Sequence, residues 1–348
     1  MRRARHLMSY ELVLLLLLAG WDVSSPTFSS PAGKSPRFQQ SAFMTRENTE
    51  LYVGEPIDRK YSHTISQSEK ILVSTLNSAG KKGQQGWAKV QHLYKRYTGV
   101  AVPVFGATLQ AAYRCKQYSE AAKMYTEIRD MGNVTVGPVL VLYGMKIFGK
   151  LQDSSAVNAI WQEVRANGWE NKFLTAARID AASEMGDMEG AASILDFMAN
   201  ETVPAYDIHF NSAINACKNS NHSKRHVAAM FVLDGMLSKG LQPTVVTFAN
   251  LAGAHRQAPL TMLEGILSRM RDSGITPNKV FAETFVGALF RGRLTAVSTV
   301  EDVHIRLNGI SKDRLRVAKS VLTDARSRGV RLTKLSSLTD QYLQQLTI

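Results

Sequence analysis

Apolar residues recur along most of the chain at the i, i+3, i+4 and i+7 spacing of a helix with one buried face. The clearest case is the stretch 207–218, DIHFNSAINACK. Its apolar positions share one face: Phe210, Ala213, Ile214 and Cys217. Its polar positions share another: Asn211, Asn215 and Lys218. Two Asn lower the helix propensity of a face that Glu and Lys usually occupy, so we expect this polar face to contact a ligand.

A closing motif recurs at the ends of predicted helices. It reads Met236-Leu-Ser-Lys-Gly240-Leu-Gln-Pro243 in one copy and Met270-Arg-Asp-Ser-Gly274-Ile-Thr-Pro277 in the next, 34 residues later. Weaker copies end at Gly132 and Gly168. The apolar residue closes a helix, the glycine supplies a left-handed cap, and the proline prevents the helix from continuing.

These patterns repeat about every 35 residues, with two helices in each repeat and no alternating strand pattern. The sequence therefore predicts an all-α fold, a stack of helical hairpins. We expect repeats at about 67–101, 102–136, 137–171, 172–206, 207–244, 245–278 and 279–312. The repeat at 207–244 is longer by three residues near His222–His226, and residues 313–348, with helices at 315–327 and 335–346, would cap the array.

The first residues have the composition of a targeting leader. A basic start precedes the apolar run Leu12–Ala19, which has signal-peptide length and is too short to span a bilayer. The following Ser24–Arg37 is rich in Ser, Pro and Gly and has no acid, as in transit peptides. We expect a cleavable leader at 1–45 and a linker at 46–66, so that the mature form has no membrane segment. A signal-like segment followed by a transit-like one is typical of plastids of secondary origin; a mitochondrial leader and plain secretion are the alternatives.

The composition excludes a disordered chain and favours an acidic partner. The 348 residues are 45% apolar, which suffices for a large core. The net charge is +13, and residues 1–46 contribute only +4, so the excess lies mainly in the body and points to nucleic acid. The two cysteines, Cys115 and Cys217, lie in apolar helical contexts and are interpreted as small buried side chains.

No catalytic pattern is present in the sequence. It has no His-x-Glu with a Cys-x-x-Cys pair, no P-loop, no Gly-x-Ser-x-Gly and no Asp cluster of a two-metal nuclease. His222 and His226 have the i, i+4 spacing of a metal pair, but they flank Lys224 and Arg225, which favours a solvated basic loop. We therefore expect a protein that is not an enzyme and that needs no cofactor or metal.

The segment Phe210-Asn211-Ser212-Ala213-Ile214 and the Met-x3-Gly-[Leu/Ile]-x-Pro endings resemble the pentatricopeptide repeat family. The resemblance covers roughly 67–312 and is strongest over 207–278, whereas the Trp and Leu-Gly-Tyr pattern of tetratricopeptide repeats is lacking. It implies a right-handed α-solenoid of about seven helix-turn-helix repeats. The first helices would line a concave face that holds single-stranded RNA, about one nucleotide per repeat.

The resemblance also assigns roles to single residues. A base edge would be read by the residue after the aromatic of the first helix, together with the last residue of the repeat: Asn211 with Thr244, Ala249 with Asn278, and Glu283 with Lys312 or Asp313. Residues that pack on the base plane would be Ile208, Val246 and Val280. Upstream, the first reader positions fall on Val73, Gly106, Val141 and Ala176. Only Asn211 among the first readers suits base recognition, since Gly, Ala and Val offer no side-chain hydrogen bond.

A basic residue recurs at the end of the first helix in every repeat except 172–206, which has Glu184 there. The series is Lys81, Lys82, Arg114, Lys150, Lys218, Arg256 and Arg291. We predict that these cations contact phosphates and give affinity without sequence information. The alternative is that they only interact with the carbonyl ends of their helices.

Together these features predict a monomeric single-stranded RNA-binding protein of an organelle. It would act in RNA processing, stabilisation or translation without catalytic activity, and a protein partner in an organellar RNA-processing complex is compatible with this role. Two other hypotheses remain: a protein–protein interaction scaffold that uses the same concave face, and a degenerate array that only docks onto a ribosome or nuclease complex.

Overall fold

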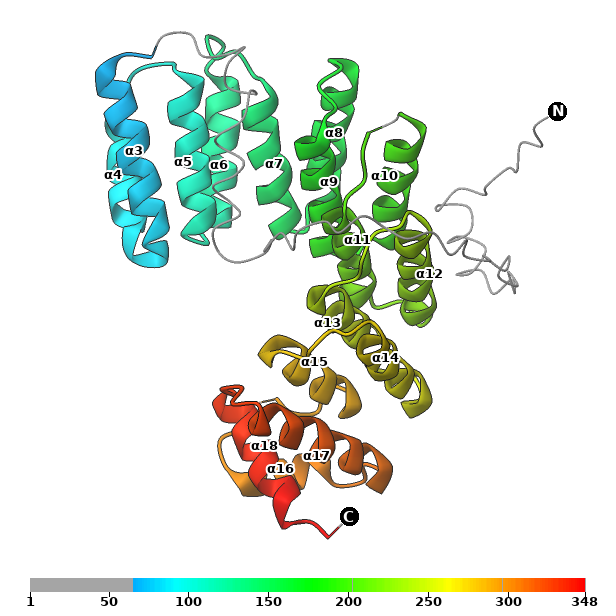
Figure 1. The fold of residues 1–348 in the computed structure, drawn as a ribbon. Helices are drawn as coiled ribbons and strands as arrows, with labels where there is room; N and C mark the ends of the chain where they lie inside the picture. Colours follow the sequence, from blue (N-terminus) through cyan, green and yellow to red (C-terminus); the bar gives the residue numbers. More distant parts are fainter. Residues whose placement is uncertain (1–64, 202, 296, 348) are drawn as a thin grey trace, which may run out of the picture. The chain divides into compact units, whose positions relative to one another are not determined.

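The structure is a computed structural model that describes residues 65–347 except 202 and 296 (Figure 1). The leader expected at 1–45 and nearly all of the linker expected at 46–66 lie outside the described residues. All regular structure in the described part is helical, so the all-α prediction is confirmed. None of the described helices is both long enough and apolar enough to cross a membrane.

The chain divides into two compact units between Met185 and Gly186. The N-terminal unit (described residues 65–185) contains four first helices and the second helices of the first three hairpins. They are α3 (Gln67–Lys81), the short 3-10 helix η1 (Gly83–Gly86), α4 (Trp87–Arg96), α5 (Val102–Arg114), α6 (Tyr118–Asp130), α7 (Pro138–Lys150), α8 (Ser154–Ala166) and α9 (Lys172–Met185).

The C-terminal unit (described residues from 186 onwards) continues the same alternation. Its helices are α10 (Met188–Asn200), α11 (Asp207–Asn219), α12 (Arg225–Ser238), α13 (Val245–Ala254), α14 (Leu260–Asp272), α15 (Lys279–Leu289), α16 (Val300–Leu307), α17 (Lys312–Ser327) and α18 (Lys334–Gln345).

Within each unit the first helices of successive hairpins pack on one another. In the N-terminal unit α3, α5, α7 and α9 form such a row, and α4, α6 and α8 complete their hairpins (Figure 1). In the C-terminal unit α11, α13 and α15 form the corresponding row. The first helices begin at residues 67, 102, 138, 172, 207, 245 and 279, close to the period read from the sequence.

Two glycines let first helices of the N-terminal unit approach closely. A Cβ atom on Gly80 of α3 would lie 2.8 Å from Ala111 Cα of α5. A Cβ atom on Gly149 of α7 would lie 2.8 Å from Ala181 Cα of α9. Because backbone stands opposite each glycine, any larger residue must push the two helices apart.

The closing motif forms the helix cap that the sequence predicts. The N–H of Leu241 donates to Met236 O at 3.2 Å and that of Ile275 to Met270 O at 3.0 Å. The glycine before each donor has a positive φ, as this cap requires. Val330 N–H donates to Ala325 O at 3.0 Å in the same way. The end of α17 is therefore a further copy, with Ala in place of Met.

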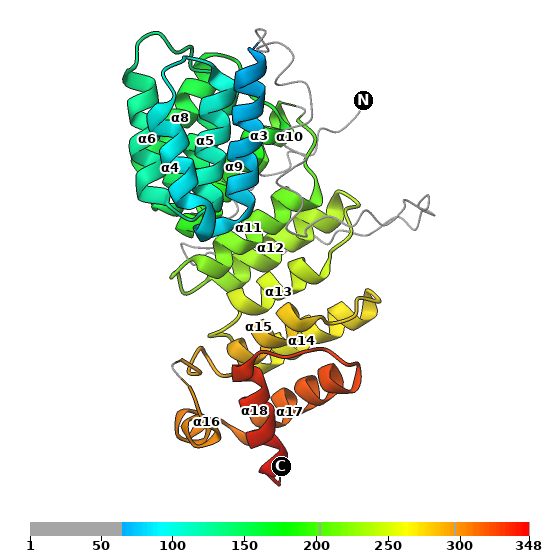
Figure 2. The ribbon, with the colours of Figure 1, turned by 90° about the vertical axis from the view of Figure 1, so that its left-hand side faces the viewer.

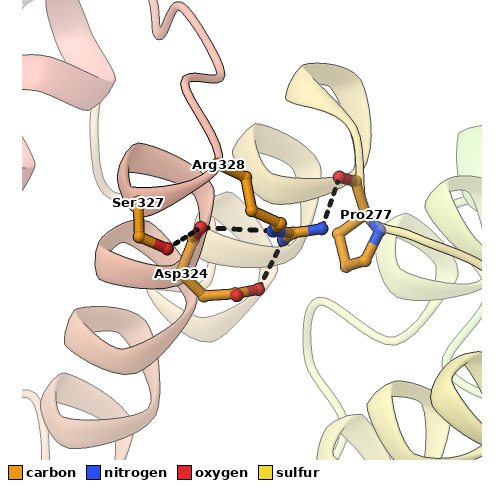
Figure 3. A network of polar contacts seen from close by, with 4 residues as sticks. All are labelled: Pro277, Asp324, Ser327 and Arg328. Atoms are coloured by element: carbon orange, nitrogen blue, oxygen red, sulfur yellow. Dashed lines mark hydrogen bonds and ion pairs between the residues drawn. The ribbon is translucent and has the colours of Figure 1, made fainter.

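This copy identifies α17 as the second helix of the hairpin that α15 begins. Arg314 Nη1, at the start of α17, donates to Leu289 O at the end of α15 at 2.9 Å. Arg328 Nη1, just after α17, donates to Pro277 O just before α15 at 3.3 Å (Figure 3). Asp324 forms an ion pair with Arg328 and orients it for this contact. The two helices are thus antiparallel and pack together.

Residues 290–311, hereafter the insertion, interrupt this hairpin. They include α16, which packs on α18 rather than on α15 (Figure 2). The sequence period predicted that the second helix of this hairpin ends before residue 312. In the structure the helix that packs antiparallel on α15 is α17. The helices expected at 315–327 and 335–346 are present as α17 and α18.

Two buried arginines hold the carbonyl ends of first helices in the C-terminal unit. Arg225, 2% exposed, donates through Nε to Ala254 O at 3.1 Å and through Nη1 to Ser220 O at 2.8 Å. Arg314, 6% exposed, reaches Ala258 O with Nη2 at 2.8 Å besides its bond to α15. Each guanidinium thereby satisfies carbonyls that a helix end leaves without partners.

Candidate nucleic-acid interface

The predicted reader Asn211 lies between α11 and α13, where it is 7% exposed. The hydroxyl of Thr247, in the first turn of α13, donates to Asn211 Oδ1 at 2.6 Å. Thr247 Oγ1 in turn accepts the N–H of Thr244 at 2.9 Å. The fold therefore brings Asn211 and Thr244, which the family resemblance pairs, to the same place through a residue that the sequence analysis did not single out.

A second chain of contacts joins Asn211 to a predicted phosphate ligand. Asn250 Nδ2 of α13 donates to Asn211 O at 3.3 Å, and Lys218 Nζ donates to Asn250 Oδ1 at 3.3 Å. The Lys218 stem passes over Gly253, where a Cβ atom would lie 2.8 Å from Lys218 Cδ. The sequence signal for Thr247 and Asn250 is that both are polar among the apolar neighbours that surround them on α13.

The other predicted readers make hydrogen bonds at the N-terminal caps of helices. Asn278 Oδ1 accepts Phe281 N–H at 2.9 Å and so caps α15, although the residue itself is exposed. Glu283 Oε1 accepts the N–H of Thr333, the cap residue of α18, at 2.8 Å. Lys312 and Asp313, which the sequence paired with Glu283, instead begin α17. Thr333 takes that place, because the insertion shifts the end of the repeat.

The residues expected to pack on bases are more open than the readers. Ile208 and Val246 are half-buried, and Val280 is 61% exposed at the start of α15. Ala249, the first reader of its repeat, is 4% exposed and has no polar side-chain atom.

The N-terminal unit presents no polar side chain at its first reader positions. Gly106, Val141 and Ala176 are buried, and Val73 is half-buried. These side chains fill space between first helices and offer a base no hydrogen bond.

The predicted phosphate ligands differ between the two units. In the N-terminal unit Lys150 forms an ion pair with Glu184, the residue that breaks the basic series, while Arg114 is half-buried and Lys81 and Lys82 are exposed. In the C-terminal unit Arg256 is half-buried and Arg291 is exposed. Between Ile208 and Leu263 the sequence has one acid, Asp234, and it lies 3.8 Å from Arg269. The cations of this segment lie mainly after the first helices and in the turns, since α11 carries both Asp207 and Lys218 and α13 carries no charged side chain.

Positive groups crowd the carbonyl ends of α11 and α13. Burial lowers the pKa of Arg225, and the charge of Arg256 adds to this. Burial likewise lowers the pKa of His255 to about 4, with smaller contributions from His226 and Arg225, although Leu251 O accepts a hydrogen bond from its ring at 2.7 Å. His255 is therefore neutral at physiological pH.

The two histidines with metal-like spacing have different neighbours. His226 packs edge to face on His255, with ring centroids 5.6 Å apart. His222 Nδ1 accepts the N–H of Lys224 at 3.1 Å. Among the described residues no three His, Cys, Asp or Glu side chains gather to hold a metal ion.

Both cysteines are buried and unreactive in their surroundings. Burial raises the pKa of Cys217 to about 12, and it also raises the pKa of Cys115. Neither is disulfide-bonded. They serve as small apolar side chains in the packing of first helices.

Residues 231–281 match the family model of the pentatricopeptide repeat domain. This segment runs from α12 through the hairpin of α13 and α14 into α15, and it contains both full copies of the closing motif. The segment 231–281 is therefore similar to a pentatricopeptide repeat domain. Helical hairpins alternate in the same way in both units.

The chain also gives distant matches to solved structures of a pentatricopeptide repeat protein. A crystal structure of the pentatricopeptide repeat protein PPR10 from maize is 17% identical, with 84% of this chain and 49% of that chain covered and a TM-score of 0.44. A crystal structure of PPR10 in complex with an 18-nt psaJ RNA element is 18% identical, with 94% and 49% covered and the same TM-score of 0.44. The chain thus spans about half the length of these solved chains. No curated protein matches it.

Proposed function

We propose that the C-terminal unit binds single-stranded RNA along α11, α13 and α15 and has no catalytic role. The observation that carries this proposal is the coincidence of base-reading and phosphate-binding chemistry on adjacent first helices. Asn211 stands in a polar network between α11 and α13, and Lys218 belongs to the same network. Few acids neutralise the cations there.

Electrostatics supports an anionic polymer as the ligand. Lys218 lies in the last turn of α11, and Arg256 and Arg291 follow the ends of α13 and α15; these three first helices pack in one row. Cations spaced along such a row suit the regular phosphates of a nucleic acid, and single strands expose the bases that a residue such as Asn211 can contact. RNA is favoured over DNA by the similarity of residues 231–281 to the pentatricopeptide repeat domain.

The biological setting that we propose is an organelle. The leader expected at 1–45 supports a plastid of secondary origin first and a mitochondrion second. By occupying a single-stranded segment, a non-enzymatic protein of this kind would protect a transcript, expose a processing site or promote translation.

The test is the salt dependence of RNA binding by the full chain. Each phosphate that a cation neutralises contributes about −0.7 to the slope of log affinity against log salt. Changing Lys218, Arg256 and Arg291 to Gln together should therefore flatten the slope by about 2, measured by fluorescence anisotropy between about 50 and 200 mM salt. The control removes the same charge from second helices of the N-terminal unit through Lys89→Gln, Lys95→Gln and Lys123→Gln, and should leave the slope unchanged. Equal slopes in both triple variants would refute the phosphate contacts, and absence of RNA binding would favour the protein-scaffold hypothesis.

A further inference from the structure

Thr247 connects the two residues that the family resemblance pairs, and its hydroxyl has one proton to give. The residue is completely buried. The N–H of Thr244 is a fixed donor and occupies a lone pair of Thr247 Oγ1 at 2.9 Å. The hydroxyl rotates freely, so its proton can turn toward Asn211.

The distance between Thr247 and Asn211 identifies which end of the amide faces the hydroxyl. The separation is 2.6 Å. This is within the range of O–H···O hydrogen bonds and shorter than N–H···O bonds usually are. The other acceptor near this hydroxyl, Thr244 Oγ1, is farther away at 3.3 Å. The amide oxygen of Asn211 therefore points to Thr247, and the amide nitrogen points away from it.

The backbone of Asn211 is held as well. Its carbonyl accepts Asn250 Nδ2 at 3.3 Å, and Asn250 is oriented in turn by Lys218, which donates to its Oδ1. Both oxygens of Asn211 are thus engaged by α13, so the amide nitrogen, with two N–H donors, is the group of this residue that can face a ligand.

We propose that Thr247 is a specificity-determining positioning residue: by holding the Asn211 oxygen, it makes the site a hydrogen-bond donor that prefers bases with a ring carbonyl to adenine. Uracil, cytosine and guanine each carry a carbonyl oxygen that can accept the Asn211 N–H, whereas adenine has only ring nitrogens as acceptors and places an amino donor beside N1 and N7. The sequence analysis treated Asn211 as both donor and acceptor. This inference rests on the proposed RNA binding and adds the direction of the hydrogen bond.

The test compares full-chain variants at Thr247 on uridine and adenosine oligonucleotides of equal length. The wild type should bind the uridine oligonucleotide about fivefold more tightly, the scale of one hydrogen bond. Thr247→Val removes the hydroxyl at constant shape and frees the amide to rotate, so the preference should fall to nearly one. Thr247→Ser keeps the hydroxyl and should retain the preference, while thermal unfolding monitors the fold of both variants.

A second variant tests the inference at the other end of the hydrogen bond. Asn211→Asp still accepts the Thr247 proton but has no donor, so the preference for uridine should disappear even if the affinity also falls. A wild-type preference in either Thr247→Val or Asn211→Asp would overturn the proposal. The salt slope should stay the same in the Thr247 variants, because no cation changes. Salt-dependent binding without base preference in the wild type would overturn this inference alone, and no binding at all would overturn both proposals.

Discussion

The two units repeat one hairpin and one hydrophobic pattern, yet they place different chemistry between their first helices. In the N-terminal unit the closest backbone approaches are small and apolar, such as Gly149 against Ala181. In the C-terminal unit it contains hydrogen-bonded side chains, of which Asn211 and Thr247 are the central pair. The comparison teaches that the period of a repeat array specifies its packing, while its capacity to bind depends on residues that the period leaves unconstrained.

The same contrast applies to the cations. Lys150 and Lys218 end corresponding first helices, and both reach across to the next first helix. Lys150 meets a carboxylate, Glu184, whereas Lys218 meets an amide, Asn250. An ion pair cancels the positive charge that attracts a phosphate, and an amide does not. The side chain on the following helix thus differs in charge between these two positions of the series.

The largest expected difference is that acid destabilises the C-terminal unit through His255. Its pKa is about 4 in the folded chain and near 6.5 when unfolded, so stability is full above pH 6.5. As the pH falls below 6.5, His255 becomes protonated in the unfolded chain but stays neutral in the folded chain. The free energy of unfolding therefore decreases progressively down to about pH 4, by about 3 kcal/mol in all. Urea unfolding at pH 7 and pH 5 should therefore differ by about 2 kcal/mol more in the wild type than in His255→Gln.

The exposed His92 of the N-terminal unit provides the matched control. His92→Gln should leave the wild-type pH dependence in place. Hydrogen exchange should localise the acid-induced opening to α11–α13. Identical pH dependence of the unfolding free energy in wild type and His255→Gln would show that His255 is not the group that makes the C-terminal unit sensitive to acid.

A smaller effect is expected from filling the close contact in the N-terminal unit. In Gly149→Ala the new methyl lies 2.8 Å from both Cα and Cβ of Ala181, so the helices must separate. The strain costs roughly 1–3 kcal/mol and is offset by about 1 kcal/mol of helix propensity, so we expect a net loss near 1 kcal/mol. Gly265→Ala in α14 meets nothing within 4 Å and should instead stabilise by about 0.5–1 kcal/mol. Chemical unfolding of both variants measures the difference, and a stabilised Gly149→Ala would mean that the first helices are not closely packed there.

The smallest effect would sharpen the comparison of the cations. Glu184→Gln removes the partner of Lys150 and should let that lysine engage a phosphate, which makes the slope of log RNA affinity against log salt steeper by about 0.7. Glu163→Gln removes an equal charge from a pair with Arg129 on second helices of the same unit and should not change the slope. If the two variants behave alike, Lys150 lies away from the RNA and the N-terminal unit binds none through it.

Much of the fold was predictable because helix caps and apolar spacing are local. The second helix of the repeat at 279–312 was not predictable, for two reasons. The short helix α16 ends at Leu307 and is followed by Gly309 with a positive φ, so it imitates a second helix and its closing motif. The closing motif of that hairpin starts with Ala325 instead of Met, so the sequence pattern did not identify it.

The candidate site was only partly predictable, because it depends on how α11 and α13 are aligned. The sequence identified Asn211 and Lys218, but it could not show that Thr247 and Asn250 would meet them across the helix row. Glu184 looked like a gap in the basic series and is instead the partner of Lys150. Contacts between helices about 34 residues apart follow from the rotation of each helix about its axis, which local patterns do not determine.

The insertion has a consequence for the order in which the C-terminal unit folds. Only five residues connect α13 to α14, whereas residues 290–311 separate α15 from α17. Closing the longer connection costs about 1 kcal/mol more in chain entropy, before the contacts of Arg314 and Arg328 can offset it. Hairpins with short turns, such as α13 with α14, therefore form first and offer a folded edge, and α17 docks onto α15 afterwards. Within the C-terminal unit, the hairpin of α15 and α17 is thus expected to close after its neighbours.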